Sequence, residues 1–315
     1  EDDGSHGLGE ATPLPGWTES YEATRQALAD ATVDRPPKPT ETPAAAHAVG
    51  CARLDAAARR DGRPLAAVLR EDGFGTDRPV PESVPVNATI GDASADETVE
   101  AATTAVDEGF AWLKLKVGVR EPNEDLTRVQ AVHTAVDDGI SLRLDANGAW
   151  DRATARRMVD RLAGIGVEYL EQPLPADDLA GHAALCGHGV NIAVDESLAE
   201  TSVQRVLDAG AADVVVIKPM AVGGPRRAID AAAAAREAGV EPVVTTTVDG
   251  VVARTAAVHV AAAIPEVTAC GLSTGSLLAE DLAADPIEIA DGEARVPAGG
   301  GLCGDGFDSL QSTHE

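Results

Sequence analysis

The chain has 315 residues, of which 44% are hydrophobic and only 3% aromatic, and its 52 acidic and 25 basic residues leave a net charge of −27. This length is enough for one large α/β barrel with a smaller piece, or for two domains. The acidity excludes nucleic acid and anionic membrane surfaces as partners, because both are negatively charged. The acidic residues are spread along the chain rather than gathered in a tail, which argues against disorder.

The same acidity predicts a salt-rich environment. A folded protein with this charge repels itself in dilute buffer, but the Debye length falls to about 3 Å near molar salt. We therefore predict a halophilic cytoplasm. The cysteines have no CxxC spacing and indicate small buried side chains in a reducing compartment. They are Cys51, Cys186, Cys270 and Cys303.

Targeting signals are not apparent in the sequence. The longest apolar stretch, Val251–Ile264, is interrupted by Arg254 and His259 and is shorter than the ~18 apolar residues of a membrane span. No basic and then apolar leader is present. Because the chain opens at Glu1 rather than at a methionine, we expect the start of the natural protein to lie upstream.

The N-terminal part predicts helices separated by proline-rich turns. A helix over residues 21–31 is expected to begin at a cap on Thr18 or Ser20. Asp34–Pro43 holds four prolines and predicts a rigid turn, and Ala44–Arg60 predicts a closely packed helix of small residues. Pro79–Pro85 marks a second boundary.

From Val84 onward, apolar strands alternate with helices. Strands are expected at Val84–Ile90, Ala111–Val117, Ser141–Asp145, Val167–Glu171, Asn191–Asp195, Val214–Ile217, Glu241–Thr246 and Val267–Gly271. Helices are expected at Asp96–Glu108, Asn123–Val136, Arg152–Leu162, Asp177–Cys186, Thr201–Ala209, Gly224–Ala238 and Val251–Ala263. This alternation is typical of a parallel sheet, and its length fits a closed (β/α)7β-type TIM barrel.

The barrel defines the expected domains. We predict a capping domain over 1–83, a catalytic barrel over 84–285, and a segment over 286–315 that returns to the capping domain. The capping domain would then be an α+β unit built from both ends of the chain.

A pair of lysines stands out in the second predicted strand. Lys114 and Lys116 are two residues apart, so both side chains point to the same face of a strand. The chain has only four lysines, and the other two are Lys38 and Lys218. Two ammonium groups held close together disfavour each other's charge, so we expect the pKa of one to fall and that lysine to act as a base. Taken alone, the pair favours another interpretation, in which it lies at a strand end with both side chains reaching solvent.

Charged residues also stand at the carboxyl ends of the following strands. Asp145, Glu171 and Asp195 end three successive strands, and Lys218 ends the next. Barrel enzymes keep their catalytic groups at this end of the strands, so we interpret the series Lys, Asp, Glu, Asp, Lys as one site. Three carboxylates brought together repel each other, and a hard divalent cation would resolve this repulsion. We therefore predict that the three acids bind Mg²⁺, or Mn²⁺ in its place.

These residues lie in motifs that resemble the enolase superfamily, in its muconate lactonizing enzyme-like subgroup. KLKVG, RLDANGAW, EQP, AVDES and VIKP match the subgroup's lysine and metal-binding strands. EATPLPGW at Glu10–Trp17 and GLSTG at Gly271–Gly275 resemble the cap segment and last strand of the o-succinylbenzoate synthases. Together with the acidity, the resemblance is to synthases of a halophilic archaeon.

The resemblance implies both a reaction and residue roles. Lys116 would be the general base and acid, Lys114 its neighbour, and Lys218 a charge-stabilising group on the opposite side. Asp145, Glu171 and Asp195 would bind Mg²⁺. The reaction would be the syn dehydration of a succinyl-hydroxycyclohexadiene-carboxylate to o-succinylbenzoate in menaquinone biosynthesis. The partner would be this small carboxylate substrate, and since members of the superfamily are often oligomeric, a homo-oligomer is compatible with the resemblance.

The sequence departs from the family in two places. The first cap strands and the specificity loop between them would lie before Glu1. Asp249 stands where a longer acidic residue is expected after the seventh strand.

Other activities share the same lysines. N-succinylamino acid racemase, dipeptide epimerase and muconate cycloisomerase are the alternatives, although epimerases usually carry Asp-x-Asp where this chain has Cys270–Thr274. Acid-sugar dehydratases usually place a histidine base after the seventh strand, and His259 lies too far into the following helix. A non-catalytic metal-binding barrel is the alternative from another class.

Overall fold

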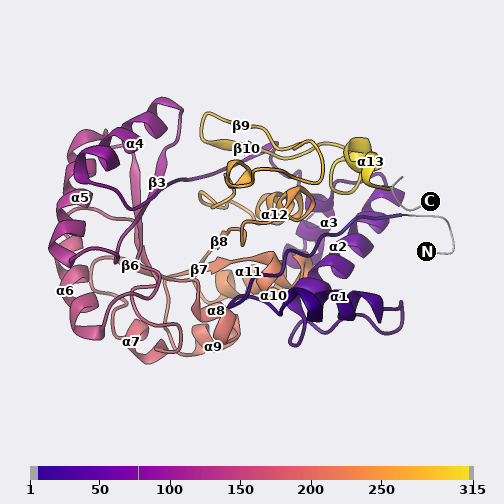
Figure 1. The fold of residues 1–315 in the computed structure, drawn as a ribbon, viewed down its shortest axis with the longest axis horizontal. Coiled ribbons are helices and arrows are strands. Elements are labelled where there is room, and N and C mark those ends of the chain that lie inside the picture. Colours follow the sequence, from indigo (N-terminus) through magenta and orange to yellow (C-terminus); the bar gives the residue numbers. More distant parts are fainter. Residues whose placement is uncertain (1–5, 77, 312–315) are drawn as a thin grey trace.

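The computed structural model describes residues 6–76 and 78–311, and its centre is a curved parallel sheet with helices on its outer side (Figure 1). Seven strands follow each other in chain order, so each pairs with the next along the sequence. They are β2 (Ala88–Ile90), β3 (Trp112–Lys116), β4 (Ser141–Asp145), β5 (Tyr169–Glu171), β6 (Asn191–Val194), β7 (Val214–Ile217) and β8 (Glu241–Val244). This arrangement confirms the predicted fold class.

The helices between the strands also follow the prediction. They are α4 (Ala95–Asp107), α5 (Pro122–Ala135), α6 (Arg152–Leu162), α7 (Leu179–Ala183), α9 (Val203–Asp208), α11 (Pro225–Glu237) and α12 (Val251–Ala263). Two short helices were not predicted, α8 (Ser197–Glu200) and α10 (Pro219–Val222). They matter for the site because each begins within two residues of a predicted site residue, Asp195 or Lys218.

The predicted last strand closes the ring without being a regular strand. Cys270 bridges to Val86 beside β2, and Gly271 bridges to Thr245 beside β8. The Asn87 N–H donates to the Cys270 carbonyl at 3.0 Å, and the Gly271 N–H donates to the Val244 carbonyl at 2.9 Å. A segment with one bridge on each side therefore joins the two ends of the sheet.

A buried arginine reinforces this closure. Arg143 in β4 is fully buried and its Nη1 donates to the Ala269 carbonyl at 2.6 Å, in the closing segment. Its Nε and Nη2 each donate to Glu168 at 3.0 Å, and the guanidinium lies over the Tyr169 ring. A guanidinium with these partners keeps its charge inside the barrel, and it ties the middle of the sheet to the closing segment.

The predicted strand Val84–Ile90 is in fact two strands. β1 (Ser83–Pro85) belongs to a separate antiparallel sheet with β10 (Glu293–Arg295) and β9 (Ile289–Ala290), in the order β1-β10-β9. The chain then passes Val86, which faces the closing segment, and enters the barrel as β2. The prediction of one strand was wrong because an apolar run does not reveal a change of partner.

Three helices precede the barrel. They are α1 (Tyr21–Ala29), capped by the Ser20 side chain, α2 (Pro43–Arg60) and α3 (Leu65–Phe74). The sequence did not predict α3. It packs against α11 and α12, and a Cβ at Gly73 would lie 2.0 Å from the Ile229 side chain. Gly73 disfavours a helix by local propensity but allows this close approach, so packing outweighs propensity here.

The C-terminal residues return to the N-terminal helices. They form the 3-10 helices η1 (Gly275–Leu277) and η2 (Gly304–Phe307) and the short helix α13 (Asp308–Gln311). The Leu302 N–H donates to Asp55 in α2 at 2.8 Å, and the Leu65 N–H donates to the Gly301 carbonyl at 2.8 Å. These contacts agree with a returning tail, whereas the domain limits at 83 and 285 stay a prediction.

Helix α12 is buried along its whole length between the barrel and these N- and C-terminal elements. His259 within it donates from Nε2 to the Leu302 carbonyl at 2.6 Å, and its Nδ1 accepts the Ala66 N–H at 3.3 Å. Burial lowers the pKa of His259 to about 4. The histidine is therefore a structural link between helices, as expected from its position. Across the described ranges, no helix is long and apolar enough to cross a membrane.

This burial predicts an acid-sensitive fold. The folded-state pKa of His259 lies below its ordinary value near 6.5, so the unfolded chain binds the extra proton more readily. The contribution to stability is complete above pH 6.5 and is lost as the pH falls toward 4, by about 3 kcal/mol. In denaturant unfolding at a series of pH values, His259→Gln should flatten this dependence. The exposed His133→Gln is the control, and an unchanged slope in His259→Gln would contradict the assignment.

Candidate active site

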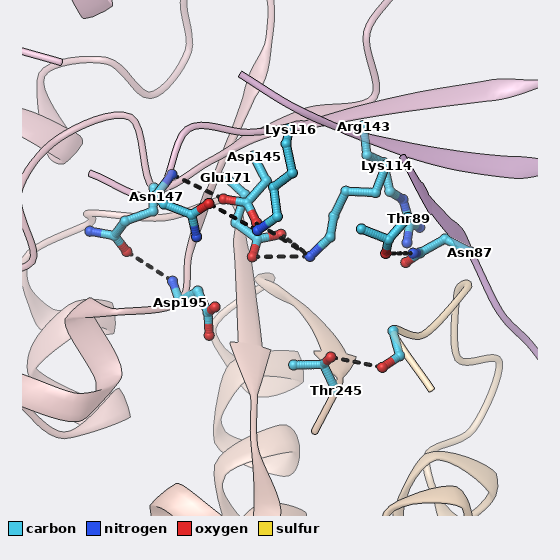
Figure 2. Close-up of polar contacts among 12 residues, drawn as sticks. Asn87, Thr89, Lys114, Lys116, Arg143, Asp145, Asn147, Glu171, Asp195 and Thr245 are labelled. Carbon is cyan, nitrogen blue, oxygen red and sulfur yellow. Dashed lines mark hydrogen bonds and ion pairs between the residues drawn. The ribbon is translucent and has the colours of Figure 1, made fainter. Parts of the chain in front are cut away.

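Most of the predicted site residues can be seen at the carboxyl edge of the barrel in Figure 2, which labels Lys114, Lys116, Asp145, Glu171 and Asp195. In the strand register, Lys116 pairs with Asp145, and Asp145 pairs with Glu171. The three residues therefore stand at the same level on neighbouring strands. Asp195 follows the end of β6, and Lys218 follows the end of β7.

The two lysines of β3 share one face of the strand, as predicted. Leu113 and Leu115 are fully buried on the other face. The Lys116 Nζ lies 2.6 Å from Asp145 Oδ2, and the Lys114 Nζ lies 3.2 Å from Glu171 Oε2. The Lys116 side chain is 33% exposed and that of Lys114 only 12%. Lys116 is therefore the lysine of this pair that a substrate can reach more easily.

The pKa of one lysine of the pair was expected to fall, and Lys114 is not that lysine. Burial would lower the pKa of Lys114, but the charges of Glu171 and Asp145 raise it above its ordinary value. The sequence argument considered only the second ammonium group. In the folded protein, carboxylates of the next two strands lie 3.2 Å (Glu171) and 3.6 Å (Asp145) from the Lys114 Nζ and favour its charged form.

Lys218 makes the corresponding contact on the other side of the acid series. Its Nζ lies 2.5 Å from Asp195 Oδ2, and both side chains are almost completely buried. Each of the three predicted metal-binding acids is therefore paired with a lysine. The lysines are the three that were predicted as catalytic residues: Lys114, Lys116 and Lys218.

The pairing leaves the acids in different electrostatic states. Burial raises the pKa of Glu171 to about 8, although Lys114 opposes the shift. Burial also raises the pKa of Asp195, against the opposing effect of Lys218. For Asp145, the two lysines of β3 outweigh burial and lower the pKa. The largest cause of the Glu171 shift is burial, which disfavours the charged carboxylate by more than the nearby lysines favour it.

A divalent cation would stabilise the charged form of these buried carboxylates. The site offers only carboxylate oxygens as ligands, which suits Mg²⁺. Asp195 Oδ1 and Glu196 Oε2 are buried and have no hydrogen-bond partner, so lone pairs are free beside the acids. As the side chains stand, the carboxylates face the lysines, and over residues 6–76 and 78–311 no three acidic, histidine or cysteine side chains converge on one metal position. The three acids fit the ion by the chemistry of their oxygen ligands.

Asn147 connects Lys116 to Glu196, the acidic residue that follows Asp195. Its side-chain oxygen accepts a hydrogen bond from Lys116 at 2.9 Å, and its Nδ2 donates to Glu196 at 2.8 Å. Its backbone N–H donates to Asp145 at 3.0 Å, and its φ is 44°. Asparagine adopts this left-handed conformation more readily than most residues, which explains why this type stands there. Sequence reasoning assigned no role to Asn147 or Glu196.

Gln172 was also missed, although it holds two strand ends together. It is fully buried, with a φ of 41° that costs a non-glycine residue about 1–3 kcal/mol. Its side-chain oxygen accepts the N–H groups of Asp195 at 2.9 Å and Ser197 at 3.2 Å. Its Nε2 donates to the Leu174 carbonyl at 3.0 Å and to Ser197 Oγ at 2.9 Å. The residue after Glu171 therefore positions the loop that carries Asp195.

Asp249 forms hydrogen bonds to two threonines, and these contacts give it a structural role. It is buried, accepts a hydrogen bond from Thr12 at 2.9 Å, and is also bonded to Thr247. Thr12 belongs to the N-terminal segment, so Asp249 helps to hold that segment on the barrel.

The curved parallel sheet and its edge of paired lysines and carboxylates define a barrel enzyme that works with charged groups. Residues 97–305 match the family model described as enolase C-terminal domain-like, and the chain belongs to the enolase superfamily, in its muconate lactonizing enzyme-like branch.

Two relatives and one solved structure illustrate this membership. The o-succinylbenzoate synthase of Thermobifida fusca is 40% identical over 235 residues, which cover 73% of this chain and 71% of that protein. Muconate cycloisomerase 1 of Rhodococcus opacus is 35% identical over 263 residues, covering 81% and 68%. The dipeptide epimerase of Enterococcus faecalis, solved with Mg and the dipeptide L-Leu-L-Tyr, matches with a TM-score of 0.82 at 26% identity, covering 94% of this chain and 87% of that one.

The role of Gln172 leads to a prediction about stability. Gln172→Met removes a buried amide and leaves the N–H groups of Asp195 and Ser197 without an acceptor. We expect the free energy of unfolding in denaturant to fall by at least about 2 kcal/mol. Gln130→Met, on the exposed side of α5, should change it by less than about 0.5 kcal/mol. Equal stability of the two variants would show that the network does not hold the loop.

Proposed function

We propose that the protein is an o-succinylbenzoate synthase, a hydro-lyase that dehydrates a succinyl-hydroxycyclohexadiene-carboxylate. One C–H bond next to the substrate carboxylate and one C–O bond break, water leaves, and the ring becomes aromatic. The observation that carries the proposal is the row of buried carboxylates with Lys116 at one end and Lys218 at the other. Its support for this reaction within the superfamily is the 40% identity with the Thermobifida fusca synthase.

The residues divide the work by position. Asp145, Glu171 and Asp195 would hold Mg²⁺, which supplies positive charge for the substrate carboxylate and makes its α-proton more acidic. Lys116, the more exposed lysine of β3, takes the α-proton and returns it to the leaving hydroxyl on the same face. Asn147 accepts a hydrogen bond from the Lys116 Nζ at 2.9 Å, and this contact fixes the orientation of the Lys116 side chain. Lys218 contributes positive charge from the side of β7.

Muconate cycloisomerase is the second candidate, because the cycloisomerase of Rhodococcus opacus is 35% identical and aligns over more of this chain than the synthase. The same lysines would also serve a racemase or an epimerase. For dipeptide epimerase, the absence of an acidic residue between Cys270 and Thr274 counts against the assignment. The alternative of another class is a metal-binding barrel without activity.

We further propose a cytoplasmic location at high salt. All four cysteines are free, and burial raises the pKa of Cys270 and Cys303 to about 11, which makes these thiols unreactive. Free thiols of this kind suit a reducing compartment. The net charge of −27 supports the salt-rich setting.

The base is tested with the proposed substrate, in concentrated KCl with magnesium. The wild-type protein should consume the cyclohexadiene, and this is measured as a loss of the ultraviolet absorbance of the diene. Lys116→Ala should reduce kcat by about 10²–10⁴-fold, the usual contribution of a general acid–base group. Lys38→Ala is the matched control, because Lys38 is exposed and forms an ion pair with the equally exposed Glu41.

The outcome also separates the candidate reactions. Turnover of muconate without turnover of the cyclohexadiene would replace the synthase with the cycloisomerase. Exchange of the α-proton of N-succinylamino acids or dipeptides in deuterated water would indicate a racemase or an epimerase. A folded protein that turns over none of them would favour the inactive barrel.

The metal ligands are tested without any substrate. Magnesium at 100 times its Kd should stabilise the wild-type protein by about 2.7 kcal/mol, seen as a rise in Tm. Asp195→Asn should lose most of this rise. Asp213→Asn is the control, because Asp213 bonds the Ile192 N–H at the amino-terminal edge of the same sheet. Equal magnesium responses in all three proteins would contradict the assignment of Asp195.

A further inference from the structure

The N-terminal segment forms a rigid turn beside the site. Leu14, Pro15, Gly16 and Trp17 make a β-turn in which the Trp17 N–H donates to the Leu14 carbonyl at 3.0 Å. Pro15 at the second position and Gly16 at the third, with a φ of 93°, are the residues that a type II turn favours. Thr18 reinforces the turn, since its hydroxyl accepts the Leu14 N–H at 2.8 Å. The direction of the Trp17 side chain is therefore set by the local backbone.

The segment is fixed to the rest of the molecule on both sides of this turn. Before it, Glu10 accepts the N–H groups of Val252 and Ala253 at 3.0 Å each, at the start of α12, where Asp281 accepts the Val251 N–H at 2.8 Å. After it, Glu19 accepts the N–H groups at the start of α2 at 3.0 Å each. Carboxylates at helix amino termini are favourable anchors. The turn is thus held at two places, and Trp17 lies between them.

Trp17 contacts the lysine at the end of β7. The Lys218 Nζ lies 3.2 Å from the centroid of the Trp17 ring. The same ammonium lies 2.5 Å from Asp195 Oδ2 and is 8% exposed, so it sits between a carboxylate and an aromatic face. Tryptophan is the best aromatic partner for a cation, and such contacts contribute about 0.5–2 kcal/mol.

Trp17 matters as a second partner of Lys218 because the first partner, Asp195, is also expected to bind the metal. Under the proposed function, Asp195 is also a ligand of the divalent cation, whose charge would repel the Lys218 ammonium. An indole carries no net charge to be neutralised, so its attraction for Lys218 persists when the carboxylate is engaged elsewhere. Trp17 can therefore keep Lys218 in place when Asp195 alone would not.

The indole also forms a wall. A cavity of about 470 Å³ lies between the Pro39–Pro43 loop and helices α8 to α11, and Trp17 is part of its lining. The residues lining it on the barrel side follow Asp195 and Lys218 in the chain, such as Leu198 and Val222. The indole thus lies between the Lys218 ammonium and this cavity, and a smaller side chain at position 17 would bring the two into contact.

We propose that Trp17 is a positioning residue of the active site, which holds the Lys218 ammonium over Asp195 and separates it from the neighbouring cavity. The inference rests on the proposed role of Lys218. It assigns to the N-terminal segment a direct part in the site, in addition to covering the barrel.

The contact itself is tested by NMR without substrate or metal. Because the chain has only four lysines, a spectrum of protein labelled with [13Cε]lysine contains four resonances, and Lys218→Arg identifies the one of interest. The ring current of Trp17 should move the ε-protons of Lys218 upfield of the other three. Trp17→Phe should reduce this shift, and Trp17→Leu should abolish it. An unshifted Lys218 in the folded wild-type protein, or a shift unchanged in Trp17→Leu, would overturn the proposal.

The consequence for activity is tested on whichever candidate substrate the wild-type protein turns over. Trp17→Leu should lower kcat by about two- to thirtyfold, the equivalent of one cation–π contact, with a smaller effect on KM. Trp17→Phe should recover most of the loss. Leu14→Ala, in the same turn but 40% exposed and without contact to Lys218, is the matched control and should retain wild-type kinetics. Equal losses in Leu14→Ala and Trp17→Leu would reduce Trp17 to a part of the turn and overturn the proposal.

The proposed function and the role of Trp17 can be disproved independently of each other. If the wild-type protein turns over none of the substrates, the proposed function is wrong, and the NMR result still decides whether Trp17 holds Lys218. If turnover is normal and Trp17→Leu changes neither the resonance nor kcat, the proposed function stands and the inference falls.

Discussion

The structure depends on the balance of buried charge at the carboxyl edge of the barrel. Asp145, Glu171 and Asp195 are almost inaccessible to water, and unpaired carboxylates in such a place are costly. Three lysines offset part of this cost, and burial still raises the pKa of Glu171 to about 8. The other features of the site can be understood as supports for this balance. Asn147 and Gln172 fix the loops that carry the charges, and Arg143 stabilises the layer beneath them.

The site is assembled from two parts of the molecule. The barrel supplies the lysines and carboxylates, one or two from each successive strand. The N-terminal segment is attached through Glu10, Thr12 and Glu19, and it brings Trp17 to the same place. Changes in the short N-terminal turn can therefore alter the environment of Lys218 while the barrel keeps its charged residues. The relatives of this chain carry the names of different reactions, which is consistent with such a division.

Much of the barrel and its charged residues could be predicted because the information is local. An apolar strand followed by an amphipathic helix has a readable period, and β4, α6, β7 and α12 were predicted to the residue. The carboxyl-end rule for parallel strands then placed Lys116, Asp145 and Glu171 side by side. Contacts between distant segments carry no such pattern. The pairing of Trp17 with Lys218, the change of partner at Val86 and the packing of Gly73 on Ile229 depend on the completed fold. The raised pKa of Lys114 could not be predicted for the same reason, since its acidic neighbours lie on other strands.

The start of α12 has a further consequence for the molecules that the barrel can accept. In many barrels of this class, the loops after the last strands and a helix amino terminus form a phosphate-binding site. Here the first free N–H groups of α12 are already bonded to two carboxylates of the protein itself, those of Glu10 and Asp281. A phosphate ester would meet negative charge and no free donors there. The chain uses this anion site to attach its own N-terminal segment, so the start of α12 is closed to a phosphate group of any ligand.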